Sequence, residues 1–206
     1  MTGASDPHLG PLSPSPWVVR FAHLVPSGGP SRGQVLDVAC GSGRHSRFFL
    51  ALGRRVVAVD KDVSGIGDLE ANANAEIVEA GLEDGRPWPL AGRRFAGVVV
   101  INYLYRPLFP ALIEAVEPGG ALIYETFARG NERFGKPRNP DHLLKSGELL
   151  EVVRGRLQVV AYEHGEVSTP RQAVVQRVCA VHDLPGRRED GEEPPPHPLE
   201  PPKGQA

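Results

Sequence analysis

The architecture of this chain follows from one stretch, Val35-Leu36-Asp37-Val38-Ala39-Cys40-Gly41-Ser42-Gly43-Arg44-His45. An apolar run containing one acid leads into a loop of small residues, and a polar start to an apolar helical pattern follows. Gly41 and Gly43 allow positive φ angles and let another group approach the backbone closely. Free N–H groups at the start of the helix are available to a ligand. The stretch therefore predicts a buried strand, a sharp turn and a helix.

A second acid, Asp60, lies seventeen residues after Gly43, at the end of the next apolar run. A glycine loop after one strand and an acid at the end of the next are typical of a nucleoside-binding βαβ unit. A dinucleotide loop needs a third glycine at position 46, where this chain has Ser46. No second mononucleotide-binding half follows, so an NAD-dependent reductase is a weaker alternative.

Length and composition indicate one soluble globular domain, with 206 residues, 40% of them hydrophobic and 23% charged. We expect neither a signal peptide nor a membrane segment, because no apolar run approaches the ~20 residues that a membrane helix needs. Cys40 and Cys179 have no metal-ligand spacing and form no disulfide framework, so we expect a cytoplasmic protein without a metal. The net charge of −2 leaves no broad basic surface for nucleic acid.

Alternating strand and helix patterns predict a parallel α/β sheet with right-handed crossovers. The predicted strands are residues 34–39, 55–60, 75–79, 95–103 and 121–127, and the predicted helices are 17–25, 43–52, 63–74, 107–116 and 146–153. A loop is predicted over 81–90 and a turn over 117–120. Two last strands, 157–166 and 172–182, lie too close for a helical crossover, so we pair them antiparallel.

The ends of the chain differ from this pattern in composition. Residues 1–16 are rich in Pro, Gly and Ser, and residues 184–206 are rich in Pro, Glu and Gly. Such segments bury too little apolar surface to fold by themselves. We therefore expect a domain over 17–183 between a disordered N-terminal segment and a disordered tail.

These motifs together resemble the class I S-adenosylmethionine-dependent methyltransferases. The resemblance rests on Asp37–Gly43, on Val57–Asp60 and on the Glu117-Pro118-Gly119-Gly120 turn before a strand. Within that superfamily the chain is similar to small bacterial proteins of the tellurite-resistance methyltransferase group, through Tyr124–Phe127 and Asn131–Gly135. The resemblance implies a Rossmann-like three-layer sandwich whose seven-stranded, mostly parallel sheet has an antiparallel last strand. It also implies a ligand at the carboxyl ends of the strands.

The resemblance further implies S-adenosylmethionine as the cofactor and assigns residues to it. Asp37 and the loop Ala39, Cys40, Gly41 and Gly43 would line the methionine part, and Asp60 would accept hydrogen bonds from both ribose hydroxyls. The Leu82 backbone N–H would meet the adenine edge, and Asn102 would line the space next to the reactive methyl. Gly81 stands where many members have an acid that contacts the adenine amino group, so either Glu83 or Asp84 substitutes for that acid or the contact is absent.

Candidates for catalysis and for acceptor binding follow the later strands. Glu125, at the end of a strand, is a candidate general base, with a salt bridge to a nearby arginine as the equal alternative. Tyr103 and Tyr105 lie at the crevice rim. His45 is a helix cap or surface residue, or alternatively a substrate contact. Arg129 and Arg133 belong to a polar segment that is either a solvated loop or a lid gripping an anionic substrate.

We expect a methyltransferase acting on a small-molecule acceptor whose identity the sequence leaves open, as it does the oligomeric state. One alternative is an S-adenosylmethionine-binding protein or partner subunit without catalysis, which the exchange of common acids for Gly81 and Ala96 keeps open. A second, weaker alternative is a methyltransferase acting on protein or nucleic acid. The nucleic-acid type is disfavoured because Asn102-Tyr103-Leu104-Tyr105 lacks the prolines of an Asn/Asp-Pro-Pro-aromatic motif.

Overall fold

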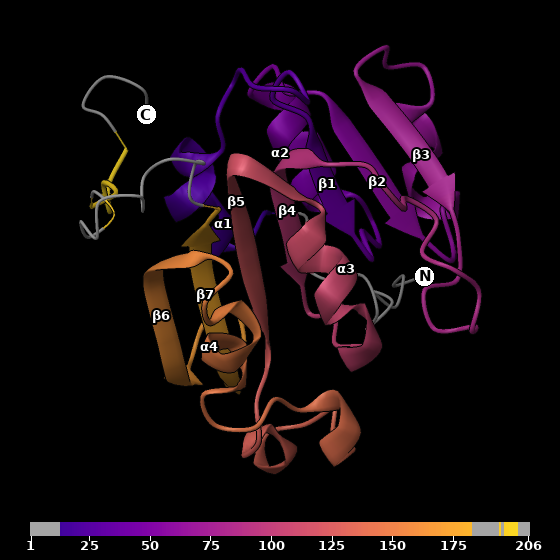
Figure 1. The fold of residues 1–206 in the computed structure, drawn as a ribbon. Helices are drawn as coiled ribbons and strands as arrows, with labels where there is room; N and C mark the ends of the chain where they lie inside the picture. Colours follow the sequence, from indigo (N-terminus) through magenta and orange to yellow (C-terminus); the bar gives the residue numbers. More distant parts are fainter. Residues whose placement is uncertain (1–12, 183–193, 195, 202–206) are drawn as a thin grey trace.

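The computed structural model describes residues 13–182, 194 and 196–201, and its centre is a seven-stranded sheet in the order β3-β2-β1-β4-β5-β7-β6 (Figure 1). The strands are β1 (Val35–Val38), β2 (Val56–Asp60), β3 (Ala75–Glu79), β4 (Phe95–Ile101), β5 (Val116–Phe127), β6 (Gln158–Val167) and β7 (Ala173–Val181). Pairing is parallel from β3 to β5, whereas β7 lies antiparallel between β5 and β6. The predicted Rossmann-like sheet with an antiparallel last strand is confirmed.

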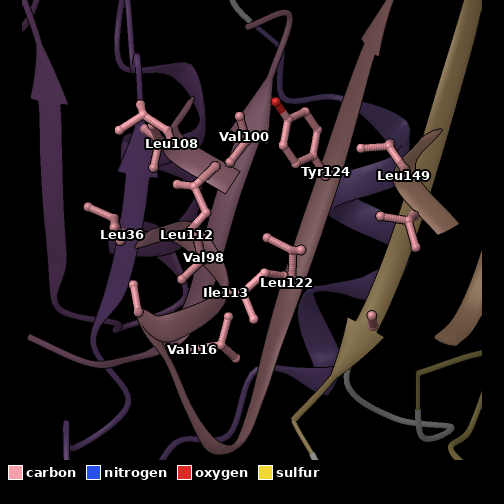
Figure 2. Packing of buried hydrophobic residues seen from close by; sticks show 14 of the residues in the cluster. Leu36, Val98, Val100, Leu108, Leu112, Ile113, Val116, Leu122, Tyr124 and Leu149 are labelled. Atoms are coloured by element: carbon pink, nitrogen blue, oxygen red, sulfur yellow. The ribbon is translucent and has the colours of Figure 1, made fainter. Parts of the chain in front are cut away.

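Short helices cover both faces of the sheet. They are α1 (Pro16–Phe21), α2 (Arg44–Ala51), α3 (Phe109–Glu114) and α4 (Glu148–Val153), with 3₁₀ turns η1 (Ala22–Leu24), η2 (Ser64–Leu69), η3 (Arg106–Leu108), η4 (Asn131–Arg133) and η5 (Pro140–His142). Trp17 of α1 and Phe49 of α2 belong to the cluster on one face. Leu112 of α3 and Leu149 of α4 belong to the cluster on the other face (Figure 2). The molecule therefore has three layers, and among its described residues no helix is long and apolar enough to cross a membrane.

Strand β4 lies at the centre of the core because its side chains are apolar on both faces, as a central parallel strand requires. All seven of its residues are buried. Val98 and Val100 pack toward α3, and Val99 packs toward the α1 side. This burial fixes the position at which β4 ends, and Asn102 follows there at the carboxyl edge of the sheet.

Two sequence predictions about local structure are wrong. The helix predicted over 63–74 forms only the short 3₁₀ turn η2, because Gly65 and Gly67 cost helix stability and this segment buries only Ile66 and Leu69. Residues 117–120 are part of β5 and form an irregular stretch, since Phe95 pairs with Val116 but Gly97 pairs with Ala121.

The N-terminal boundary also differs from the prediction. Ser15 is buried and caps α1, whose first residue is Pro16, by accepting a hydrogen bond from the Trp17 N–H to its Oγ atom at 3.1 Å. The predicted disorder of residues 1–12 and most of that of 184–206 concerns residues outside the described part of the chain.

Candidate cofactor and acceptor site

The loop after β1 turns sharply because three of its residues have left-handed backbone angles. The φ angles are 52° at Ala39, 53° at Gly41 and 70° at Gly43. The Cys40 N–H still donates to the Val59 carbonyl of β2 at 3.1 Å, so the loop remains attached to the sheet. This geometry brings the loop backbone to the carboxyl edge, directly before α2.

The two glycines of the loop have different surroundings. A Cβ atom on Gly43 would lie 2.5 Å from Cγ2 of Ile66, so this glycine is needed for packing between the loop and η2. A Cβ on Gly41 would have no atom within 4 Å and would project into open space. Gly41 therefore presents bare backbone to any ligand at this edge, as a nucleoside cofactor requires.

Asp60 ends β2 beside this bare backbone. Its Oδ2 atom accepts a hydrogen bond from the Gly41 N–H at 2.8 Å, and its Oδ1 atom accepts one from the Asp62 N–H at 3.1 Å. A carboxylate has about four acceptor positions, so Asp60 retains positions for two ligand hydroxyls. The Asp60 carboxylate beside the bare backbone of Gly41 thus fits the hydroxyls of the ribose of the predicted cofactor.

Asp37 lies beneath the loop and is buried, with the Ser46 hydroxyl of α2 donating to its Oδ2 atom at 2.6 Å. Burial raises the pKa of Asp37 to about 6 despite this hydrogen bond. Cys40 is also buried, and burial raises the pKa of its thiol far above the usual range, which is the behaviour of a packed side chain rather than a nucleophile.

Leu82 and Gly81 follow β3 on the neighbouring part of the edge, and Leu82 packs half-buried against the core. A Cβ on Gly81 would lie 2.5 Å from Oδ2 of Asp84. The Asp84 carboxylate therefore occupies the space that an acidic side chain at position 81 would take, and Arg86 pairs with it at 2.7 Å. Of the two substitutes named for the missing acid, Asp84 is the one next to position 81.

A cavity of about 220 Å³ lies at the carboxyl ends of β4 and β5. Its lining residues come from three connections and one strand end: Glu83, Asn102, Tyr103, Leu104, Thr126, Phe127, Pro137 and His142. Asn102 has a φ angle of 59°, and its N–H donates to the Glu125 carbonyl at 2.9 Å, which turns the chain away from the sheet. Because β4 lies between β1 and β5, this pocket and the glycine loop lie at the same edge of the sheet.

Tyr103 contributes an enclosed hydroxyl to this pocket. The hydroxyl lies beside the Glu83 carboxylate but has no hydrogen bond of good geometry among the described residues. Burial, and then the negative charge of Glu83, raise the pKa of Tyr103, so its hydroxyl stays protonated and is a donor. The Tyr103 carbonyl accepts the Tyr124 hydroxyl at 2.9 Å, which fixes the backbone. Tyr105 is half-buried and is not among the lining residues.

The segment 128–145, which carries Pro137 and His142, is tied to distant strands by buried amides. The Asn131 side chain donates to the Pro137 carbonyl at 3.2 Å and accepts from the Val174 N–H of β7 at 3.3 Å. Gln176 of β7 accepts from the Leu149 N–H at 2.8 Å and donates to the Lys145 carbonyl at 2.9 Å. These contacts make the segment a supported wall of the pocket.

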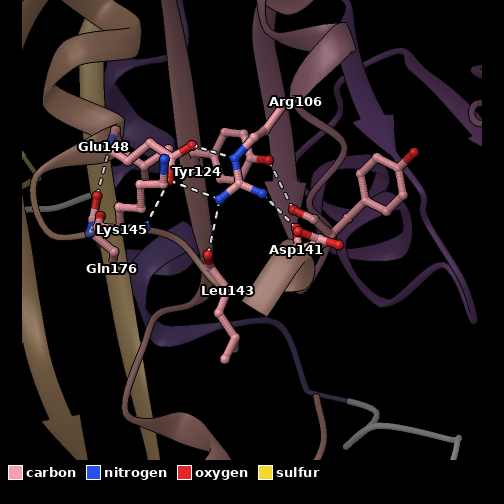
Figure 3. A network of polar contacts seen from close by, with 9 residues as sticks. Arg106, Tyr124, Asp141, Leu143, Lys145, Glu148 and Gln176 are labelled. Carbon is pink, nitrogen blue, oxygen red and sulfur yellow. Dashed lines mark hydrogen bonds and ion pairs between the residues drawn. The ribbon is translucent and has the colours of Figure 1, made fainter. Parts of the chain in front are cut away.

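Arg106, directly after the pocket-lining part of the β4–α3 connection, holds the other end of this wall (Figure 3). Its guanidinium pairs with Glu148 at 2.6 Å and donates to the carbonyls of Asp141 and Leu143 at 2.5 and 3.0 Å. Although burial opposes it, the hydrogen bonds from Arg106 and from the Lys145 N–H hold the pKa of Glu148 below its usual value. The charged pair therefore fastens the wall to the start of α4.

Glu125 points to the α1 side of the sheet, where its Oε2 atom lies 2.5 Å from Nε of Arg177 and its Oε1 atom accepts from the Ser15 hydroxyl at 3.2 Å. His45 is buried in the same region, and its Nε2 atom accepts from the Ser15 N–H at 3.2 Å. Burial, and then Arg44, lower the pKa of His45 to about 3. The salt-bridge alternative for Glu125 thus has structural support, and neither side chain lines the pocket.

The two arginines suggested as grips for an anion lie outside the pocket lining. Arg133 pairs with Glu166 of β6 at 2.6 Å, and Arg129 is exposed, with its N–H donating to the Leu144 carbonyl at 3.0 Å. Sequence reasoning did not single out Thr126, Phe127, Pro137 or His142 as individual lining residues. The polar composition of the segment after Glu125 was the signal that pointed to this region.

Comparison with known proteins agrees with this geometry. Residues 35–120 match the family model described as a methyltransferase domain. No curated protein matches the sequence. The match covers the glycine loop, Asp60, the β3 connection and β4, but ends before the segment that walls the pocket.

Solved methyltransferases have the same fold. One is the 1,6-didemethyltoxoflavin-N1-methyltransferase of Burkholderia thailandensis with bound 1,6-didemethyltoxoflavin and S-adenosylhomocysteine, with a TM-score of 0.58 and 20% identity over 81% of this chain and 76% of that one. Another is the N-methyltransferase NodS of Bradyrhizobium japonicum in complex with S-adenosylhomocysteine, with a TM-score of 0.61 and 13% identity over 86% and 93%. The sheet described above is thus an α/β methyltransferase fold.

Proposed function

We propose that this protein binds S-adenosylmethionine and transfers its methyl group to a small-molecule acceptor. The observation that carries the proposal is the bare backbone at Gly41 beside the Asp60 carboxylate, next to a separate pocket at the ends of β4 and β5. One part of the carboxyl edge fits a nucleoside, and the neighbouring part has room for a second molecule. The methyltransferase-domain match over residues 35–120 supports the same conclusion.

The proposed roles of the residues follow from their positions. Asp60 holds the ribose hydroxyls, the Leu82 N–H and the Asp84 carboxylate meet the adenine, and the loop at Gly41 packs against the methionine part. When bound, the cofactor supplies a methyl group already activated on a positively charged sulfur. The protein therefore has mainly to orient the acceptor and to exclude water from the pocket.

The family subgroup and the compartment are further parts of the proposal. Tyr124–Phe127 and Asn131–Gly135 support membership of the tellurite-resistance methyltransferase group, because these residues lie beside or within the pocket wall. Cys40 and Cys179 are free and buried, which supports a cytoplasmic location, where thiols stay reduced.

Calorimetric titration tests the cofactor assignment. We expect the protein to bind S-adenosylmethionine and S-adenosylhomocysteine but not NAD. Asp60→Ala should weaken the binding of both at least tenfold, about 1.4 kcal/mol, because charge-assisted hydrogen bonds to the ribose are lost. Glu70→Ala, which removes an exposed acid from the β2–β3 connection that follows Asp60, is the control and should leave the affinity unchanged.

Two results would contradict the proposal. Unchanged affinity in Asp60→Ala would show that Asp60 does not hold the ribose. Selective binding of NAD would show that the cofactor is NAD and not S-adenosylmethionine. A second measurement follows a labelled methyl group from S-adenosylmethionine into a cell extract. Label in the small-molecule fraction supports the proposed acceptor class. Label in protein or nucleic acid, or no transfer at all, contradicts it.

A further inference from the structure

The pocket at the ends of β4 and β5 has an uneven charge. Its lining contains one carboxylate, that of Glu83, and neither lysine nor arginine is among its lining residues. The carboxylate within the lining therefore favours a cation over an anion as the bound molecule.

The two arginines that are paired at the pocket wall, Arg106 and Arg133, direct their charge elsewhere. Arg106 uses its guanidinium on Glu148 and on the carbonyls of Asp141 and Leu143. Arg133 is paired with Glu166 on the far side of the wall. Both of these guanidinium groups are thus matched by an acid outside the pocket lining, whereas Glu83 is itself part of the lining.

The polar atoms of the lining indicate what the pocket recognises. The enclosed Tyr103 hydroxyl has no well-formed hydrogen bond among the described residues, and an enclosed polar atom in a native structure calls for a partner such as a ligand. The Tyr103 hydroxyl and the Glu83 carboxylate together offer both a donor and an acceptor to a single polar group. A nitrogen base matches them in both charge states: its N–H groups donate to the Glu83 carboxylate and to the Tyr103 oxygen, and the lone pair of the neutral base accepts from the Tyr103 hydroxyl.

We infer that this pocket binds a small nitrogen base, an amine or a nitrogen heterocycle, and discriminates against carboxylates and other anions. Glu83 selects for positive charge on the nitrogen, and Tyr103 orients it. The inference rests on the proposed function, because it treats this pocket as the acceptor side of a methyl-transfer site. It also replaces the anionic substrate that Arg129 and Arg133 suggested.

The size and the walls of the pocket restrict the acceptor further. Its volume of about 220 Å³ is below the roughly 300–1,000 Å³ of sites for drug-sized ligands. Phe127 and Leu104, both buried, provide apolar surface, and the Tyr103 side chain lines the same pocket. A compact, flat molecule with a nitrogen at one end fits these walls.

The test uses benzylamine, benzyl alcohol and benzoate, which share a ring and differ in charge. Binding is followed by chemical-shift changes in the ¹⁵N-labelled protein, with and without saturating S-adenosylhomocysteine. We expect benzylamine to bind at least tenfold more tightly than benzoate, with shifts at Asn102 and Tyr103. Glu83→Gln should abolish this preference, and Glu79→Gln, an exposed acid at the end of β3, should retain it.

The outcomes separate the two proposals. Failure to bind S-adenosylhomocysteine would contradict the proposed function, while the probe comparison in its absence would still decide the inference. Equal binding of benzylamine and benzoate, preference for benzoate, or binding of neither would overturn the inference. A preference for benzylamine that survives Glu83→Gln would overturn the role of Glu83. Glu83 is exposed in a loop, so the variant should fold, which its thermal unfolding verifies.

Discussion

The loop after β1 and the segment after β5 both lie at the carboxyl edge of the sheet, yet they are held in different ways. The loop depends on nearby strands, through Cys40 to the Val59 carbonyl and Gly41 to Asp60. The segment 128–145 depends on β7 and on the β4–α3 connection, through Asn131 and Arg106. The proposed cofactor site and the proposed acceptor site are thus built from separate parts, which separate substitutions should disable.

The largest expected effect is that of Asn131→Ala. The substitution leaves the buried Val174 N–H and the Pro137 carbonyl without their partners. We expect it to lower the free energy of unfolding by about 3 kcal/mol, because each unsatisfied group costs ~1–3 kcal/mol. Chemical denaturation measures this loss. Methyl transfer should fall strongly, while the affinity for S-adenosylhomocysteine stays within twofold of wild type.

Asn139→Ala is the matched control for this prediction. The Asn139 side chain is exposed and accepts from the Asp141 N–H at 3.0 Å, as a cap of η5. Its loss should cost about 1 kcal/mol. Equal losses of cofactor affinity and of methyl transfer in Asn131→Ala would show that the two parts of the edge do not act separately.

The second effect concerns Asp37 and pH. Its folded pKa of about 6 is above the unfolded value of 3.8. The unfolded chain therefore releases this proton more readily, and the stability that protonated Asp37 contributes below pH 3.8 is lost as pH rises to about 6. The change is on the order of 2 kcal/mol. Asp37→Asn should remove it, so wild type should gain stability relative to the variant as pH falls from 6 to 4.

His45 changes wild-type stability in the opposite direction, because its folded pKa of about 3 makes protonation favour unfolding below pH 6.5. The measurement is therefore the difference between variant and wild type at each pH, in which the His45 contribution cancels. Asp62→Asn is the control, since hydrogen bonds from Ser64 lower the pKa of the exposed Asp62. The stability of wild type relative to this variant should therefore fall, not rise, as the pH is lowered. A difference between wild type and Asp37→Asn that is independent of pH would refute the assignment.

The fold could be predicted because its signals are local. The valines of β4, the glycine loop and Asp60 each determine structure through near neighbours in the chain or through burial on both faces. The helix predicted over 63–74 failed for a physical reason, since Gly65 and Gly67 permit only a short 3₁₀ turn. The strand continuing through residues 117–120 depends on pairing with β4, which the Pro-Gly-Gly pattern does not reveal.

The candidate site divides in the same way. Asp60 and Gly41 lie where the sequence predicts, because a parallel sheet brings the ends of β1 and β2 together. Glu125 was harder to place, because alternation along β5 sends its side chain to the face of Ser15 and Arg177, with Thr126 on the opposite, pocket-lining side. His142 lines the pocket beside Asp141, whose carbonyl accepts a hydrogen bond from Arg106. Arg106 lies thirty-five residues earlier in the chain than Asp141, so this contact could not be read from the local sequence.

The third effect tests the wall from its other end. Arg106→Gln removes the ion pair with Glu148 and the bonds to the carbonyls of Asp141 and Leu143. Because the pair is only partly buried, we expect a loss of about 1.5 kcal/mol in the free energy of unfolding. The KM for the acceptor should rise, and calorimetry should give an unchanged Kd for S-adenosylhomocysteine. Arg154→Gln, which breaks the exposed pair with Glu151, is the control and should alter neither quantity.

The smallest effect on stability, and the sharpest test of the cofactor part, is that of Gly41→Ala. The new Cβ meets no protein atom, so the cost is that of a φ angle of 53°, about 1 kcal/mol. Gly53→Ala at the end of α2 has a φ angle of 73° and equally open surroundings, and should cost the same. Only Gly41→Ala should weaken S-adenosylhomocysteine binding, by at least tenfold, because its Cβ takes the space that the ligand needs. Equal affinities in the two variants would mean that the bare backbone at Gly41 does not face the cofactor.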